Sequence, residues 1–207
     1  GSDESGKQKQ EWETKLDDLD VNATLVDLSN SNITSDDLIQ IVERLKKMPK
    51  LVELGLTGNK ITFIKALGEL TNLERLCLDQ NQITDIELLG KLVTLTYLDL
   101  EENQITSIES LSNLINLTKL YLSKNQITSI DSLGGLVNLA ELYFDVGVAD
   151  PHRIIQRNKL DNLDVNAAEV DLSSSDITSD DLILIVERLK KMPNLVELSL
   201  KGNQITS

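Results

Sequence analysis

One eleven-residue pattern recurs along the chain and restricts what it can fold into. The segment 95–105 reads LTYLDLEENQI, with leucine or isoleucine at its first, fourth, sixth and eleventh positions and asparagine at its ninth. The same pattern fits four further segments, 51–61, 73–83, 117–127 and 195–205. A sequence that repeats one apolar frame in this way predicts a stack of similar units that share a continuous core.

Apolar and polar residues alternate at the start of each frame, which is typical of a short β-strand. In LTYLDL, Leu98 and Leu100 flank Asp99, so one face of the strand is buried and the other is exposed. A strand this short gains stability only when parallel neighbours cover it. The recurring asparagine is expected to bond the backbone of its own turn and of the next one, at Asn59, Asn81, Asn103, Asn125 and Asn203.

The frames are spaced by two different distances, which predicts two kinds of turn. Central strand residues from Leu54 to Leu142 follow one another every 22 residues, whereas Val26 and Leu54 are 28 apart. A 22-residue turn leaves room opposite the strand for an extended piece or a single helical turn. A 28-residue turn leaves room for a longer helix.

The first long turn predicts a helix over residues 35–48. Ser35 is the expected N-cap, Asp36 and Asp37 lie in the positive first turn, and Pro49 ends the helix. Its apolar stripe consists of Leu38, Ile41, Val42 and Leu45.

These two turn lengths resemble two classes of leucine-rich repeat. The short turns are similar to those of internalins and phosphatase regulators, and the long turns to those of the ribonuclease-inhibitor type. The resemblance covers about nine tenths of the chain and implies an α/β leucine-rich repeat solenoid, a horseshoe with a parallel concave β-sheet and helices or extended segments on its convex side. It implies little about function, because this fold is a scaffold for many different partners.

The frames divide the chain into four segments. They are a tail and capping helix at 1–22, the repeat array at 23–149, an irregular turn or internal cap at 150–166, and a second, truncated copy of the first repeats at 167–207. Residues 159–206 match residues 15–62 at a constant offset of 144, with ten mismatches in 48 positions. The capping helix is expected over 11–19, with Trp12, Leu16 and Leu19 covering the first turn.

Composition excludes several classes of function. The formal net charge of −14 disfavours nucleic acid and anionic membranes, and no apolar run is long enough to cross a bilayer. The single cysteine, Cys77, permits no disulfide framework, which fits a cytoplasmic protein or an exported bacterial one. Arg75 is expected to lower the pKa of that thiol, but no base accompanies it.

No cofactor, metal site or catalytic set is predicted. His152 is the single histidine, and no motif places a carboxylate or thiol beside it. A nucleophile, a base and an oxyanion site cannot be assembled from the sequence, so an enzyme is not expected.

The side chains between the leucines are expected to face the hollow of the horseshoe. Ten of these positions are acidic and three are basic, and all three tyrosines of the chain fall among them in consecutive turns. Tyrosine beside carboxylates suits a partner that offers lysine or arginine together with apolar surface. The residues expected to bind it are Tyr97, Tyr121, Tyr143, Asp79, Asp99, Glu101, Glu141, Asp145, Arg75 and Lys119. The alternative is that tyrosine simply favours strands and that the acidic residues are ordinary solvated surface.

Two hypotheses of function follow. The first is a non-enzymatic scaffold that binds a basic or amphipathic segment of another protein on this acidic concave face. The second is an engineered repeat scaffold with no natural partner, which self-associates through its open terminal repeats. The near-copied terminal module favours the second hypothesis, whereas Cys77 and the irregular segment 150–166 count against it.

Overall fold

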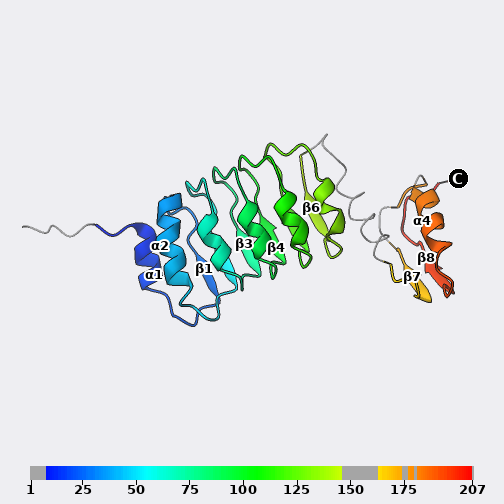
Figure 1. Ribbon diagram of the computed structural model, residues 1–207, viewed down its shortest axis with the longest axis horizontal. Coiled ribbons are helices and arrows are strands. Elements are labelled where there is room, and N and C mark those ends of the chain that lie inside the picture. The colour runs from blue at the N-terminus through cyan, green and yellow to red at the C-terminus, as the bar shows by residue number, and fades with distance from the viewer. Residues whose placement is uncertain (1–7, 146–162, 174–176, 180, 207) are drawn as a thin grey trace, which may run out of the picture.

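Short parallel strands, one in each repeat, build the fold (Figure 1). The structure is a computed structural model that describes residues 8–145, 163–173, 177–179 and 181–206. One sheet has six strands in the order of the sequence, and a second sheet has two. The strands are β1 (Leu25–Asp27), β2 (Glu53–Gly55), β3 (Arg75–Cys77), β4 (Tyr97–Asp99), β5 (Lys119–Tyr121), β6 (Glu141–Tyr143), β7 (Glu169–Asp171) and β8 (Glu197–Ser199). The predicted parallel sheet is confirmed.

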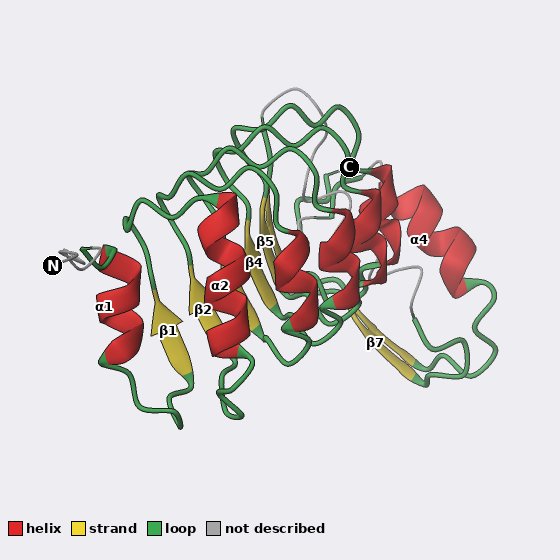
Figure 2. Cartoon of the chain, turned by 60° about the vertical axis from the view of Figure 1, so that its left-hand side comes forward, coloured by secondary structure: helices red, strands yellow, loops and turns green. Residues whose placement is uncertain are grey.

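Helical segments return the chain from each strand of the six-stranded sheet to the next. The 28-residue turns from β1 to β2 and from β7 to β8 carry an α-helix, and the four 22-residue turns from β2 to β6 each carry five residues of 3₁₀-helix, as the turn lengths predict. In Figures 1 and 2 the helical segments of this array follow one another along one side, opposite the strands. The described segments are α1 (Glu11–Asp17), α2 (Ser35–Leu45), η1 (Lys65–Glu69), η2 (Glu87–Lys91), η3 (Glu109–Asn113), η4 (Asp131–Gly135) and α4 (Asp181–Leu189).

The leucines of successive strands pair in register and form one core. Leu76 lies opposite Leu98, Leu98 lies opposite Leu120, and all three are fully buried. The core of the six-stranded array is continuous from Trp12 to Leu142. Each buried leucine contributes roughly 1.5–3 kcal/mol of transfer free energy, so neighbouring repeats stabilise one another.

The buried asparagines join each turn to the turn before it. The Nδ2 group of Asn103 donates to the carbonyls of Leu78 and Leu100, both at 3.0 Å, and its Oδ1 accepts from the amide of Ile83 at 3.0 Å. The expectation that the bonds run to the next turn is therefore wrong. Among the described residues the carbonyl of Leu78 and the amide of Ile83 have no hydrogen-bond partner in the backbone. Both groups belong to the preceding turn, so it is there that the asparagine side chain supplies hydrogen bonds.

The N-cap of helix α2 lies one residue earlier in the sequence than predicted. Thr34 is the N-cap, and its hydroxyl accepts a hydrogen bond from the Asp37 amide while the Asp37 carboxylate accepts one from the Thr34 amide. Ser35 is the first helical residue, because Thr34 is the last one with an extended backbone. The helix ends at Leu45 rather than at residue 48, since the amides of Lys47 and Met48 bond carbonyls three residues back.

Helix α1 covers the first repeat, as predicted, although it ends at Asp17. Trp12 and Leu16 are buried in the core of the array. The Lys15 ammonium donates to the hydroxyl of Ser31 at 2.8 Å, and Asp17 pairs with Arg44 of α2 at 2.8 Å. Polar contacts at its edge thus fix the cap in place.

The second sheet belongs to a smaller unit with its own core. Val170, Leu172, Ile177, Ile185 and Met192 are its buried apolar residues. Most of the predicted irregular segment 150–166, including His152, lies outside the described residues, and the division of the chain into four segments stays a prediction. No helix in the described part of the chain has the length and apolar character needed to cross a bilayer.

Candidate protein-binding surface

The three tyrosines lie on neighbouring strands of the six-stranded sheet. Tyr121 on β5 is directly opposite Tyr143 on β6, whereas Tyr97 on β4 is opposite Lys119, two residues before Tyr121. They alternate with buried leucines, so their side chains point away from the core. Tyr97 and Tyr121 are half-buried, and Tyr143 is 48% exposed.

The rings touch one another and form what we call the tyrosine stack, Tyr97, Tyr121 and Tyr143. The centroids of Tyr121 and Tyr143 are 4.7 Å apart with the ring planes 4° from parallel, and those of Tyr97 and Tyr121 are 5.4 Å apart and tilted. The guanidinium of Arg75 lies over the Tyr97 ring, 4.2 Å from its centroid. The stack therefore runs across three strands, and Arg75 extends it to a fourth. The sequence alone predicts the three tyrosines on one face of consecutive strands, but it does not predict the contact with Arg75.

Carboxylates flank the stack on the strand-exit side. The amide of Glu101 donates to Asp99 Oδ1 at 3.0 Å, which would favour the ionised form. Partial burial outweighs this bond and, together with the charges of Asp79 and Glu101, raises the pKa of Asp99 to about 6. The surface thus concentrates negative charge where it is least well solvated.

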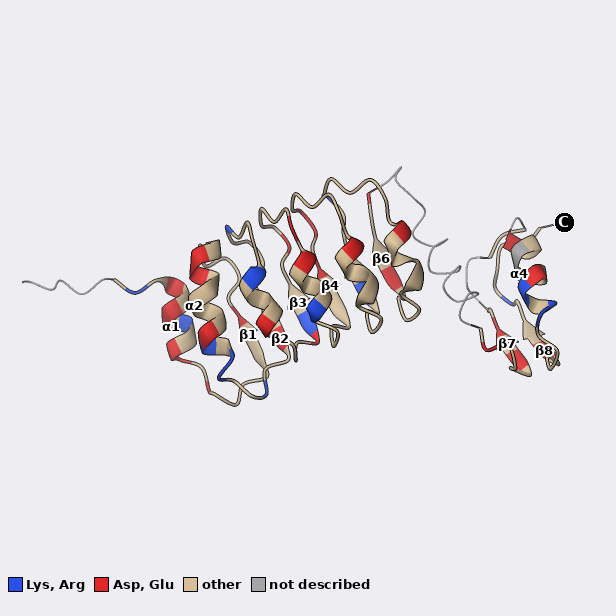
Figure 3. Ribbon diagram, viewed as in Figure 1, with Lys and Arg blue, Asp and Glu red and all other residues tan. Residues whose placement is uncertain are grey.

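The predicted basic residues are already paired with carboxylates on the same face. Arg75 Nε lies 3.2 Å from Glu53 and Lys119 Nζ lies 3.6 Å from Glu141, with all four side chains substantially exposed. Pairs this exposed contribute little to stability. They do cancel both basic charges locally, so the net charge of the predicted surface is negative. Figure 3 shows acidic positions recurring along the strands and helices with fewer basic ones among them.

Family comparison places this geometry among known proteins. Residues 71–113 match a model of two leucine-rich repeat copies, and residues 93–145 match a further leucine-rich repeat model. Residues 71–145 are therefore similar to leucine-rich repeats. No curated protein matches its sequence significantly.

Solved leucine-rich repeat structures share the fold. An internalin of Listeria monocytogenes, inlF, has a TM-score of 0.57 and 23% identity, over 89% of this chain and 56% of that one. Internalin C2 of the same organism has a TM-score of 0.55 and 28% identity, over 89% of this chain and 74% of that one. The chain thus spans little more than half the length of the first structure. Similarity to these two structures shows a shared repeat fold.

Two predicted binding residues of the leucine-rich repeat array also have structural roles. Asp145 Oδ1 accepts a hydrogen bond from the Lys124 amide at 2.8 Å, and Asp79 Oδ1 accepts one from the Thr57 hydroxyl at 2.8 Å. Both bonds tie a turn to the one before it. Each carboxylate is thereby held in a fixed position and keeps further acceptor capacity.

The expectation that Arg75 leaves Cys77 with a lowered pKa is wrong. Burial, together with the nearby carboxylates of Asp99 and Asp79, raises the pKa of the thiol to about 11. Arg75 is engaged with Tyr97 and Glu53 instead, and its effect on the thiol is outweighed. Within the described residues no group of histidine, cysteine and acidic side chains has a metal-binding arrangement.

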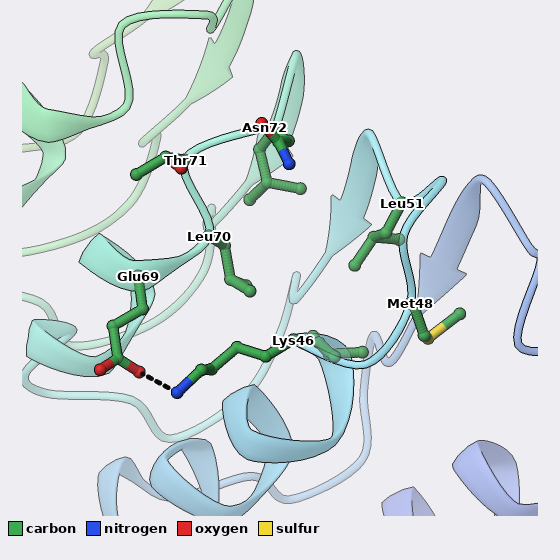
Figure 4. Close-up of a pocket in the computed structure, with 9 residues that line it drawn as sticks. Lys46, Met48, Leu51, Glu69, Leu70, Thr71 and Asn72 are labelled. Carbon is green, nitrogen blue, oxygen red and sulfur yellow. Dashed lines mark ion pairs between the residues drawn. The ribbon is translucent and has the colours of Figure 1, made fainter.

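A cleft of about 230 Å³ lies away from the predicted residues, where the long first repeat meets the first short one. Leu45, Met48, Leu51 and Leu70 supply apolar walls, and Lys46 pairs with Glu69 across it at 3.4 Å (Figure 4). The cleft is small and open, because α2 is replaced there by the shorter η1. It contains no reactive group.

Proposed function

We propose that the concave face of the leucine-rich repeat array binds a basic or amphipathic segment of another protein, with the tyrosine stack at its centre. The observation that carries this proposal is the stack itself: three phenol rings in contact, partly exposed, beside the carboxylates of Asp79 after β3, Asp99 on β4 and Glu101 after β4. The opposed reading, ordinary surface tyrosine, gives no reason for the rings to be consecutive and in contact.

The stack suits an interface in energetic terms. Tyrosine offers a large apolar area with few rotatable bonds, and its hydroxyl still bonds polar groups. The rings already support one another at 4.7 Å and 5.4 Å, so a partner would order them at little further entropic cost. Burial also raises the pKa of Tyr97, which keeps its hydroxyl protonated and able to donate.

The charge of the face favours a basic partner. Asp79, Asp99 and Glu101 are clustered beside the stack, and the net charge of the whole chain is −14. Opposite charge accelerates encounter and suppresses acidic competitors. Binding at this surface is therefore expected to weaken as salt concentration rises.

The test uses a display library of random peptides selected against the full chain. Affinities of the recovered peptides are then measured for the chain and for a variant with Tyr97→Ala, Tyr121→Ala and Tyr143→Ala. We expect a loss of more than about thirtyfold, because central tyrosines typically supply at least 2 kcal/mol. Selected peptides should also be enriched in lysine and arginine.

A matched control replaces three exposed aliphatic residues of consecutive repeats that lie off the strands, Val93→Ala, Ile115→Ala and Val137→Ala. This control should bind within twofold of the parent chain, and circular dichroism should show both variants folded. Peptides that bind the triple tyrosine variant as tightly as the parent would refute the proposal, as would a selection without basic residues.

A further inference from the structure

The two ends of the tyrosine stack differ. At the β3 end, the Arg75 guanidinium lies over the ring of Tyr97 and its Nε is 3.2 Å from a carboxylate oxygen of Glu53. Ring, guanidinium and carboxylate thus form one assembly. An arginine satisfies both partners, because its planar group stacks on an aromatic face while its N–H groups bond an acid at the edge.

The β6 end of the stack has the ring but no cation. One face of Tyr143 is covered by Tyr121, almost parallel at 4.7 Å. β6 is the last strand of its sheet, and Tyr143 remains 48% exposed. No described aromatic ring or cation stacks on the other face of Tyr143.

Two carboxylates lie beside the Tyr143 ring, one before it and one after it along the chain. Glu141 precedes Tyr143 by two residues and Asp145 follows it by two, so the alternation of the strand directs all three toward the concave side. The amides of Lys124 and Asn125 hold Asp145 in position at 2.8 Å and 3.4 Å, and Glu141 is partly exposed with a long ion pair to Lys119 at 3.6 Å. Both acids therefore retain oxygens that can accept bonds from a ligand.

We propose that the open face of Tyr143, between Glu141 and Asp145, is an arginine-binding site for the protein partner. The inference rests on the proposed function and specifies which side chain the partner must present. The ligand repeats the arrangement at the other end of the stack, with the guanidinium against the ring and its N–H groups directed at the two acids. Lysine fits less well, because its ammonium has no flat face and three donors converge on one atom.

The probe is N-acetyl-arginine amide, titrated into the full chain and followed by nuclear magnetic resonance of the backbone amides. We expect saturable shifts concentrated at residues 141–145. N-acetyl-lysine amide should bind at least about fivefold more weakly. N-acetyl-citrulline amide, which is planar but uncharged, should also bind more weakly.

Three variants locate the site. Tyr143→Leu should abolish the shifts, and Glu141→Gln and Asp145→Asn should each weaken binding severalfold. Asp145→Asn retains an oxygen for the shorter bond from the Lys124 amide and gives up only the 3.4 Å bond from the Asn125 amide, so it mainly tests charge. Phe63→Leu is the control, since Phe63 is an equally exposed aromatic residue, 50%, that stacks on no described ring.

Each outcome decides between the alternatives. Equal affinity for the arginine and lysine probes, or shifts that persist in Tyr143→Leu, would overturn the arginine site. Loss of library-selected peptides in the triple tyrosine variant would still support the concave face as the binding surface. Failure of this inference is thus distinguishable from failure of the proposed function.

Discussion

At the scale of single residues, Asp99 is a carboxylate whose ionised form is disfavoured by its surroundings in the folded chain. Its pKa is raised from 3.8 to about 6, because burial and the charges of Asp79 and Glu101 oppose ionisation. The folded chain therefore binds this proton more tightly than the unfolded chain. The stabilisation that the protonated Asp99 gives to the fold is complete below about pH 4, falls as the pH rises from about 4 to about 6, and is absent above that range.

Asp99→Asn is expected to stabilise the chain near neutral pH. The amide oxygen can still accept from the Glu101 amide, while the unfavourable charge is gone. Urea denaturation should show a gain on the order of 1–2 kcal/mol near pH 7 that disappears near pH 4. Glu109→Gln, at an exposed position on η3, should change stability little at either pH. A gain of equal size at both pH values would contradict the assignment.

The buried asparagines differ in exposure and should differ in cost. Asn103→Ala leaves the amide of Ile83 without its acceptor in the core and removes one of the two asparagine donors to each of the Leu78 and Leu100 carbonyls. We expect a loss of about 2–4 kcal/mol in the free energy of unfolding. Asn125→Ala removes equivalent bonds at a half-buried position, where water can replace them, so its cost should be smaller. An equal cost at both positions would show that exposure is not what decides it.

At the scale of elements, the short cap α1 protects the open side of the first repeat. Trp12 is 2% exposed although it lies in a helix of seven residues. Trp12→Ala should destabilise the array by about 3–5 kcal/mol, as measured by urea denaturation followed by circular dichroism. Thr14→Ala, at an exposed position of the same helix, is the control and should cost little. A loss below about 1 kcal/mol would mean that the cap is dispensable.

The strands were predictable because the alternation of apolar and polar residues fixes their position. The alternation around Leu98 and the 22-residue spacing place β2 to β6, and the 28-residue spacing places β1, because a shift of one residue would expose the leucines of a strand. Helix ends were less predictable. Thr34 and Ser35 can both cap a helix, and only the backbone conformation decides between them.

The candidate protein-binding surface was predictable only in part, because the sequence fixes the register of the strands but not the contacts between side chains. Register places the three tyrosines on one face, but ring orientation depends on contacts such as that of Arg75 with Tyr97. The pKa of Cys77 was misjudged because sequence shows the neighbouring arginine and not the depth of burial. Asp145 has a backbone role that only the folded turn reveals.

At the scale of the whole molecule, the two units differ in how well their equivalent residues are covered. Leu54 is fully buried by β3, whereas Leu198, its counterpart 144 positions later, is 39% exposed on β8. Hydrogen exchange should therefore be faster at β7 and β8 than at β4 and β5, since opening costs less where fewer apolar contacts are lost. Mass spectrometry of exchanged peptides measures this difference directly.

Equal protection of the two units would contradict that expectation. It would indicate that the edge of β8 is covered in solution, as the predicted self-association through the terminal repeats requires. Sedimentation at several concentrations separates the cases. A monomer with fast exchange at β8 agrees with the exposed Leu198, and a dimer with slow exchange supports self-association, which stays a prediction.

The strict register of the strands fixes the position of each concave side chain by the repeat to which it belongs and by its place along the strand. Inserting one complete 22-residue repeat between β4 and β5 would leave every leucine packed as before. It would nevertheless place a repeat between Tyr97 and Tyr121, which lie in adjacent repeats, and so break the contact between their rings. The binding surface can thus be altered without altering the core, because an inserted repeat brings its own leucines but separates the tyrosines.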